Sequence, residues 1–204
     1  MNPFPPEIVD IHTHKWPSAH AIFNLPSYTS APAASEGRLF SAGIHPWDTA
    51  APLPEELWQR LKATIARPEV VAVGECGLDS RRGATLEIQE QIFLRQAAIA
   101  SDAGKPIIVH CTGAWHRLLA LARKLPGDCP RIIHGFRRNA VLARQLLDAG
   151  YSLSFGEYFD PEALRVTPAE HRFAETDESS LSIEKIIDLQ QLSLREFYNK
   201  SIKL

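Results

Sequence analysis

The stretch VVAVGE (70–75) joins a run of apolar, mostly β-branched residues to a single carboxylate at its end. Two later stretches, PIIVH (106–110) and RIIH (131–134), repeat this arrangement with a histidine in the last position. Continuous apolar runs of this length are typical of strands buried on both faces, as in parallel sheets and barrels. The sequence therefore predicts parallel strands whose carboxyl ends carry polar side chains.

Comparable runs on either side predict the remaining strands. The predicted strands are 7–11, 38–44, 69–74, 106–110, 131–134, 151–155 and 171–175, with a candidate eighth strand near 21–25. Amphipathic stretches at 84–103, 114–125 and 139–149 predict helices between the later strands. This alternation predicts an α/β architecture, and the polar residues at the strand ends favour a TIM-like (β/α) barrel. An open α/β sheet would also place ligands there, so the alternation alone does not decide between the two.

Both ends of the chain depart from this alternation. Residues 15–37 contain three prolines and have no helical period long enough for a crossover helix, so we expect a shortened barrel with one or two early helices missing. Residues 181–204 return to a helical pattern and predict one or two helices packed on the outside. We expect a single domain over 1–204, with the barrel at about 7–180 and the helical tail at about 181–204.

The composition limits the class of protein. With 204 residues, 45% of them hydrophobic, the chain can bury one sizeable core. Its apolar runs are too short to span a bilayer, and it starts without a secretory pattern, so we expect a cytoplasmic protein without a membrane partner. Three cysteines are too few for a disulfide framework. The net charge of −2 gives no global basic field, although a local basic patch remains open.

The residues at the predicted strand ends suggest a metal centre. His12 and His14, in the stretch DIHTH, point to the same side of an extended chain and can share one cation. Each candidate alone has an ordinary explanation, such as a helix N-cap for Asp177. In a barrel, however, the carboxyl ends of the strands meet around one mouth. We therefore predict six ligands there, namely His12, His14, Glu75, His110, His134 and Asp177.

A divalent cation would satisfy several of these groups at once. A mixture of imidazoles and carboxylates suits Zn, Mn, Fe or Ni, whereas an all-oxygen shell would favour Mg. Mg is nevertheless among the cations expected. Two cations roughly 3.5–4 Å apart, bridged by a carboxylate, are consistent with this number of ligands. We expect one or two divalent metal ions.

Seven segments, in order, resemble the strand-end motifs of the TatD family of metal-dependent deoxyribonucleases. They are DIHTH (10–14), AGIHPW (42–47), GECGLD (74–79), PIIVHC (106–111), IIHGF (132–136), GYSLSFG (150–156) and ETD (175–177). The family belongs to the amidohydrolase-like barrels, and the resemblance covers about residues 8–177. It implies hydrolysis of a DNA phosphodiester by water that bound cations activate.

The resemblance also implies roles for individual residues. His12, His14, Glu75 and Asp177 match one metal site, with Glu75 as the bridge, and His110 and His134 match the second. His45 matches a histidine outside the metal shell, with a role in binding the substrate phosphate. Asp177 would accept the proton of the attacking water, which makes Asp177 and Glu75 the predicted catalytic residues.

Some residues near the predicted mouth keep two interpretations. Arg137 and Arg138 stand where the family has small residues, and they would meet a substrate phosphate or lie solvated on the surface. Three tryptophans near strand ends would stack on a base or pack over the barrel end; they are Trp16, Trp47 and Trp115. Cys76 and Cys111 alternate with ligands along their strands, and we expect them in the core.

Two rival functions remain open at this point. The same metal shell would serve a hydrolase of small phosphate esters, amides or lactones, because the metal does not fix the electrophile. A non-catalytic descendant that keeps its metal is the second rival. DNA or a small phosphate ester is the expected partner, and no obligate protein partner is evident.

Overall fold

The structure is a computed structural model that describes residues 2–15, 20–25 and 37–201, with side chains up to residue 195. Eight strands form one sheet in chain order, and every neighbouring pair is parallel. The strands are β1 (Asp10–Thr13), β2 (Ala21–Asn24), β3 (Leu39–Ala42), β4 (Val70–Asp79), β5 (Ile107–Thr112), β6 (Arg131–Ile133), β7 (Tyr151–Phe155) and β8 (Arg172–Ala174).

The first and last strands meet and close the sheet into a barrel. A parallel bridge joins Thr13 to Asp177, just beyond β8. Across the same seam, both carboxylate oxygens of Asp10 accept hydrogen bonds from Thr176, one from its backbone N–H (3.0 Å) and one from its hydroxyl (2.7 Å). The predicted TIM-like barrel is therefore confirmed, and the candidate strand near 21–25 is β2.

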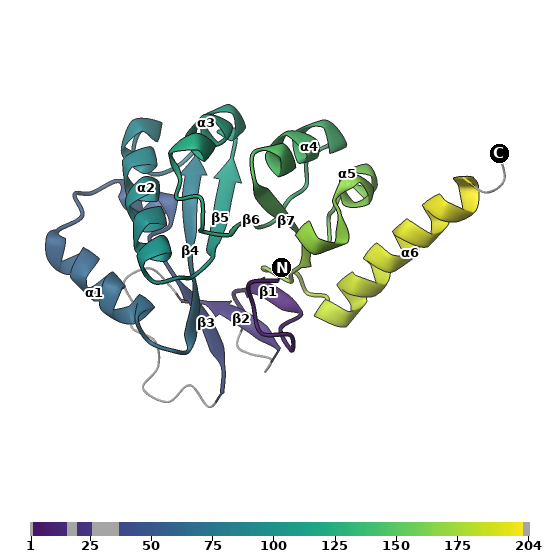
Figure 1. Ribbon diagram of the computed structural model, residues 1–204, viewed down its shortest axis with the longest axis horizontal. Helices are drawn as coiled ribbons and strands as arrows, with labels where there is room; N and C mark the ends of the chain where they lie inside the picture. The colour runs from purple at the N-terminus through teal and green to yellow at the C-terminus, as the bar shows by residue number, and fades with distance from the viewer. Residues whose placement is uncertain (1, 16–19, 26–36, 202–204) are drawn as a thin grey trace.

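Helices cover the outside of the later strands (Figure 1). The helices are α1 (Glu55–Ile65), α2 (Leu86–Asp102), α3 (Trp115–Leu121), α4 (Ala140–Asp148), α5 (Pro161–Val166) and α6 (Ile183–Ser201), with short 3-10 turns η1 (Pro46–Thr49), η2 (Ala122–Lys124) and η3 (Ala169–His171). The three predicted crossover helices correspond to α2, α3 with η2, and α4. α1 and α5 were not among the predicted helices.

The wall is thin on the side of the first strands. In the described residues between β1 and β3, which are 14, 15, 20, 25, 37 and 38, the chain forms no helix. The first helical turn of the described chain is η1, after β3. The irregular segment predicted at 15–37 otherwise lies mostly outside the described residues, and so does Trp16.

Two predicted ligands lie inside their strands rather than beyond them. β4 continues past Glu75 to Asp79, and β5 includes His110. These strands were predicted to end at residues 74 and 110, so both extend beyond their predicted ends. The cause is that the loops after β4 and β5 begin late, because Cys76–Asp79 pair in register with Val109–Thr112.

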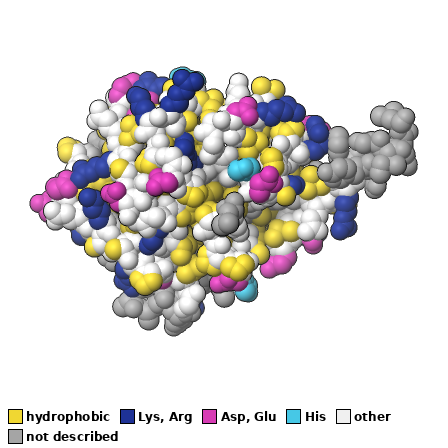
Figure 2. All heavy atoms as spheres, viewed as in Figure 1, with side chains coloured by type: hydrophobic (Ala, Val, Ile, Leu, Met, Phe, Trp, Pro, Cys, Tyr) yellow, Lys and Arg dark blue, Asp and Glu magenta, His cyan; other side chains and the backbone are white. Residues whose placement is uncertain are grey.

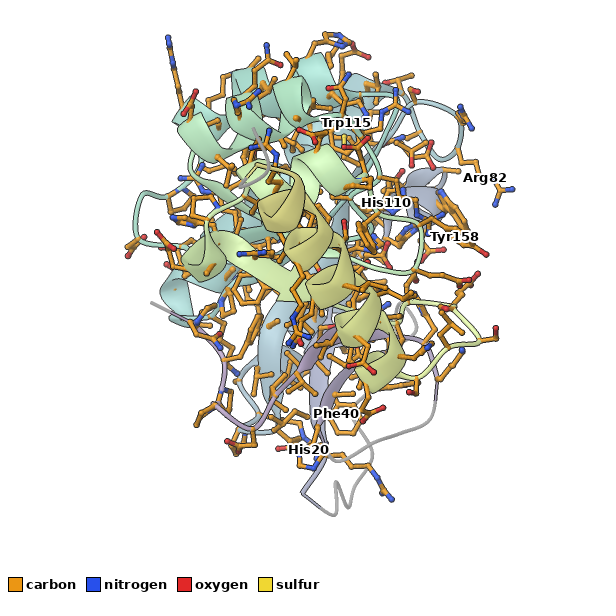
Figure 3. The ribbon with its side chains drawn as sticks, turned by 90° about the vertical axis from the view of Figure 1, so that its right-hand side faces the viewer. His20, Phe40, Arg82, His110, Trp115 and Tyr158 are labelled. Carbon is orange, nitrogen blue, oxygen red and sulfur yellow. The ribbon has the colours of Figure 1, made fainter. Side chains whose placement is uncertain are left out.

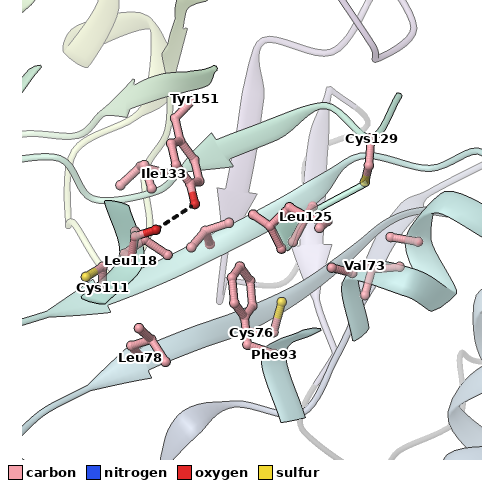
Figure 4. Packing of buried hydrophobic residues seen from close by; sticks show 14 of the residues in the cluster. Val73, Cys76, Leu78, Phe93, Cys111, Leu118, Leu125, Cys129, Ile133 and Tyr151 are labelled. Atoms are coloured by element: carbon pink, nitrogen blue, oxygen red, sulfur yellow. Dashed lines mark hydrogen bonds between the residues drawn. The ribbon is translucent and has the colours of Figure 1, made fainter. Parts of the chain in front are cut away.

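The main core lies between the sheet and its helices. Phe93 on α2 is fully buried against strand residues that include Cys76 (Figure 4). Nearby, the hydroxyl of Tyr151 donates to the carbonyl oxygen of Leu118 at 3.3 Å. All three cysteines are free and buried, and Cys76 and Cys111 lie in this core as predicted.

A smaller core fills the inside of the barrel. Its strand residues include Ile22, Ala72, Ile108 and Ile132, while Phe4 and Ile8 precede β1. Side chains two positions apart on a strand point to the same face. The residues two positions after three of these isoleucines are therefore also directed inward; they are Asn24, His110 and His134. Apolar residues close the lower part of the barrel, and polar residues occupy its mouth.

The C-terminal tail is a single helix, α6. Its first turns pack on the barrel, with Ile183 and Ile186 buried and the Gln190 amide donating to the carbonyl oxygen of Phe155 at 2.8 Å. The helix then runs away from the barrel (Figure 1). No described helix combines the length and the apolar character needed to cross a membrane. On the face shown in Figure 2, basic and acidic side chains are interspersed.

Candidate metal centre

Glu75 occupies the middle of the barrel mouth. Its side chain is 5% exposed, and its backbone N–H donates to Asn24 Oδ1 at 2.9 Å, which ties β4 to β2. Its carboxylate oxygen Oε2 lies 3.4 Å from Nε2 of His12 and 3.4 Å from Nε2 of His14. The two imidazole rings stand at right angles with centroids 4.9 Å apart. As the sequence predicts, both rings point to one side.

The other oxygen of Glu75, Oε1, faces a different set of rings. It lies 2.7 Å from His134 Nε2, 2.8 Å from His110 Nδ1 and 3.2 Å from His45 Nε2. His110 Nδ1 and His134 Nε2 are themselves 3.2 Å apart. One carboxylate thus separates two groups of ring nitrogens, each within reach of a common cation.

Asp177 lies across the barrel seam from the first group. Its N–H donates to the carbonyl oxygen of His12 (2.9 Å), and its own carbonyl oxygen accepts from His14 N–H (3.2 Å). This places Asp177 Oδ1 3.7 Å and 3.6 Å from Nε2 of the two histidines. The φ of Asp177 is 50°, a left-handed conformation that Asp and Asn adopt more readily than most residues. The helix-cap explanation for Asp177 is wrong, because Ser182 precedes α6 and its side chain accepts from Lys185 N–H.

A second layer of polar groups lies behind the second pair of histidines. His134 Nδ1 lies 3.7 Å from Oε1 of Glu175, which also accepts the N–H of Gly135. His110 Nε2 lies 3.2 Å from Thr112 Oγ1 and 3.5 Å from Asp79 Oδ2. Acceptors behind a ligating imidazole fix its tautomer and orientation.

The charges of the cluster depend on one another. Burial alone would raise the pKa of Glu75, but the charge of His134 and the nearby rings of His110 and His12 hold that pKa well below its usual range. Burial alone would lower the pKa of His134, but Glu75 and Glu175 raise it well above its usual range. Contact with Glu75 also raises the pKa of His14, against burial. An ionised carboxylate therefore lies beside the rings of His14 and His134, whose raised pKa values favour a positive charge.

The donor set fits a divalent cation. Both ring nitrogens of His12 and Nδ1 of His134 are buried without a hydrogen-bond partner in the described structure. Buried polar atoms without partners are costly, and a cation would engage Nε2 of His12 together with its carboxylate neighbours. The possible ligand sets are His12, His14 and Asp177; His12, Glu75 and His134; His45, Glu75 and His110; and His134, Glu175 and Asp177.

The structure brings all six predicted ligands together, and His45 joins them. Arg137 is also nearby, with a guanidinium nitrogen 3.7 Å from Asp177 Oδ2. All of these ligands except the buried His12 line a cavity of about 500 Å³. Three supporting residues were not anticipated as individual contributors; they are Asn24, Asp79 and Glu175. Asp79 and Glu175 stand within the segments GECGLD and ETD, an even number of positions from Glu75 and Asp177, and this spacing was the signal that could have identified them. No such signal marks Asn24.

Comparison with known proteins finds relatives of this chain both in sequence and in fold. A family model described as "TatD related DNase" matches residues 25–186. A "3'-5' ssDNA/RNA exonuclease TatD" of Cronobacter turicensis is 36% identical over 150 residues, which are 67% of this chain and 56% of that protein. The protein of the same name from Escherichia coli K12 is 41% identical over 106 residues, 47% of this chain and 37% of that protein. The matched part of the chain thus spans 56% of one relative and 37% of the other.

The fold also has solved counterparts. YJJV, a TatD homolog from Escherichia coli K12, superposes with a TM-score of 0.72 at 18% identity, covering 93% of this chain and 90% of that chain. A TatD family hydrolase from Entamoeba histolytica gives a TM-score of 0.62 at 18% identity, covering 83% and 73%. At such identities these likenesses concern the fold, and they agree with the eight-stranded parallel barrel.

Proposed function

Because this chain belongs to the TatD-related DNase family, we propose that it hydrolyses phosphodiester bonds in nucleic acid with the help of one or two divalent cations. The observation that carries the proposal is the position of Glu75, whose two oxygens face two separate groups of ring nitrogens. The names of the exonuclease relatives support a single-stranded nucleic acid as the substrate.

We assign the ligands by the oxygen of Glu75 that they face. His12, His14 and Asp177 would hold one cation with Oε2. His110 and His134 would hold the other with Oε1, so that Glu75 bridges the two sites. A mixed nitrogen and oxygen shell favours Zn, Mn, Fe or Ni over Mg. When bound, such cations lower the pKa of a water molecule toward neutrality and neutralise charge on the phosphoryl oxygens.

The chain's own residues would perform the remaining steps. Asp177 is 21% exposed, so its carboxylate contacts solvent and can accept the proton of the attacking water. Arg137 and His45 border this carboxylate and Glu75, and we assign them to the phosphate of the substrate. Asn24 holds the backbone of Glu75 and thereby orients its carboxylate. The three free, buried thiols are compatible with a reducing compartment, and we propose the cytoplasm.

The test is hydrolysis of single-stranded DNA by metal-stripped protein resupplied with Mg, Mn or Zn. We expect turnover only with added metal, and a loss of roughly 10²–10⁴-fold in Asp177→Asn, which suits the left-handed backbone but cannot accept the proton. His12→Ala should lose activity with its metal. His20→Ala is the matched control, because His20 is exposed and lies at the opposite end of the barrel from His110 (Figure 3).

The proposal fails if wild-type protein binds metal stoichiometrically and leaves DNA intact. In that case the same preparations should be assayed on a small aryl phosphodiester, a monoester, an amide and a lactone. Turnover of one of these with DNA untouched would identify a small-molecule hydrolase, for which a cavity of about 500 Å³ has room. No turnover of any of them would identify a metal-binding protein without catalytic activity.

A further inference from the structure

A second cavity of about 680 Å³ adjoins the metal centre on one side of the barrel mouth. The two cavities share four lining residues, which are Trp47, His110, His134 and Asp177. We call the second cavity the basic groove, and its remaining lining residues include Arg81, Thr112, Trp115, Arg137 and Arg138. It is formed by residues at or beyond the ends of β4, β5 and β6. A substrate whose scissile bond lies at the metal centre can therefore extend into this groove.

The two cavities differ in charge. Arg81 follows β4, whereas Arg137 and Arg138 follow β6, and all three are exposed. Within the described chain, neither Arg81 nor Arg138 forms an ion pair with a carboxylate, so their charges are available to a ligand. The first cavity, by contrast, has Asp48 and Glu178 at its edge and no lysine or arginine among its described lining residues. An anionic chain leaving the metal centre would thus be attracted toward the basic groove.

Aromatic side chains stand along the same groove. Trp47 is 46% exposed, and its indole N–H donates to Asp79 Oδ2 at 2.6 Å, which fixes the ring. Trp115 is half-buried and packs edge-on against Phe136, with centroids 5.9 Å apart. Figure 3 shows Trp115 and His110 at the same end of the molecule. Fixed aromatic rings beside cations are the combination with which proteins bind single-stranded nucleic acid.

We propose that the basic groove binds the nucleotides of a single strand next to the scissile phosphodiester, with Arg81 and Arg138 contacting backbone phosphates. This inference rests on the proposed function and adds to it the side of the mouth that the strand occupies. A single phosphate ester would need one cluster of cations at the metal centre. Here the guanidinium groups stand on loops after different strands, and they line the basic groove but not the first cavity. This spread of positive charge matches the repeated negative charge of a polynucleotide.

The test measures binding of single-stranded DNA of about 12 nucleotides to metal-loaded protein as a function of salt. The strand carries phosphorothioate linkages so that it resists hydrolysis during the measurement. Each phosphate contact on a single strand contributes about −0.7 to the slope of log K against log [salt]. The double variant R81A/R138A should therefore show a slope less steep by about 1.4 and an affinity at least about tenfold lower than wild type.

Two further variants separate the groove from general charge effects. R60A/R144A removes the same charge from exposed arginines on α1 and α4, and it should keep the wild-type slope and affinity. R81K/R138K should recover most of the slope, because lysine keeps the charge. Thermal unfolding of each variant verifies its fold.

The inference is wrong if R81A/R138A keeps the wild-type slope, if R60A/R144A loses as much as R81A/R138A, or if wild-type protein does not bind the strand. Hydrolysis of an unmodified strand by wild type is followed in parallel. Arginine-dependent binding without hydrolysis would leave the groove standing and refute the proposed function. Hydrolysis together with unchanged binding by R81A/R138A would refute the groove alone.

Discussion

Glu175 shows how a buried carboxylate can serve a metal centre indirectly. It is fully buried beside His134, and one of its oxygens has no hydrogen-bond partner in the described structure. Burial alone would raise its pKa, but contacts with His134 lower it, so the carboxylate is ionised. We regard Glu175 as a positioning residue that orients His134 and increases its basicity.

Replacing this carboxylate should weaken metal binding without unfolding the protein. Glu175→Gln keeps the volume but removes the charge behind His134, and we expect metal affinity to fall about 10–100-fold. Competition with a chromophoric chelator measures the change. Glu170→Gln, at an exposed site, is the control. Equal affinities in the two variants would contradict the positioning role.

The buried thiols give the protein a defined response to alkaline pH. Burial raises the pKa of Cys111 to about 12 and that of Cys129 to about 11, from an ordinary value of 9.0. At a pH between the ordinary and the raised pKa values, the folded protein keeps its thiol protons, whereas the unfolded chain has released them. The contribution of these protonated thiols to the free energy of unfolding is fully present below pH 9.0 and is lost as the pH rises toward 11–12.

We therefore expect the free energy of unfolding to decrease above pH 9.0. Urea unfolding at a series of pH values measures the decrease. The double variant Cys111→Ala/Cys129→Ala should show a shallower decline, because it lacks two of the groups that titrate. A decline of the same steepness in both proteins would show that other groups are responsible.

At the scale of elements, the sequence predicted strands better than helices. Strands such as 106–110 combine β-branched residues with clear boundaries, and all seven predicted strands and the candidate eighth are present. α1 has Pro54 and two glutamates at its start, and α5 begins at Pro161 with Asp160 as its N-cap, so both carry ordinary helix-start signals. α1 lies in the wall between β3 and β4, after the segment 15–37 in which helices were expected to be missing. The six residues of α5 are too few to show a helical period.

The candidate metal ligands could be predicted from the sequence, whereas the residues that hold them in place could not. His12, Glu75 and His134 are polar residues at or near the ends of apolar strands, and this position alone marks them. Asn24 and Asp79 act by accepting particular N–H groups, and such contacts depend on register and loop length, which the sequence pattern does not fix. The mouth of the barrel was therefore predicted by residue type, and its second layer required the structure.

Gln89 on α2 holds the loop that carries Arg81. Its side chain is 1% exposed and accepts the N–H of Asp79 at 2.8 Å. Its amide nitrogen lies within 2.8–3.0 Å of three carbonyl oxygens, those of Asp79, Arg82 and Ala84. One side chain thus takes the place of regular backbone pairing in this loop.

Gln89→Leu keeps a similar volume but leaves these backbone groups without partners. We expect the free energy of unfolding to fall by about 2–4 kcal/mol, since each unsatisfied buried group costs about 1–3 kcal/mol. Gln91→Leu, an exposed position on the same helix, should change it by less than about 0.5 kcal/mol. Urea unfolding compares the two, and similar values would mean that water satisfies the loop equally well.

At the scale of the whole molecule, metal binding should stabilise the fold. The cluster gathers residues from β1, β4, β5 and the loops after β3, β6 and β8, so a bound cation links most of the barrel. Binding only to the folded state adds about 2.7 kcal/mol when free metal is 100 times its dissociation constant.

Unfolding by urea with and without Zn or Mn measures this gain. We expect a higher free energy of unfolding with metal, and a much smaller gain in His12→Ala, which lacks a buried ligand. His20→Ala should behave as wild type. A gain that is the same in His12→Ala and wild type would mean that the metal acts elsewhere.

The seam between β1 and β8 also bears on when activity can arise during synthesis. Its hydrogen bonds join residues 163 to 166 positions apart, such as Thr13 and Asp10 with Thr176. Contacts of such long range form late, because a large loop must close before they contribute. His12 and His14 leave the ribosome early, but Asp177 reaches them only after most of the barrel has been made. A nascent chain therefore lacks a complete set of candidate metal ligands until the segment after β8 has docked against β1.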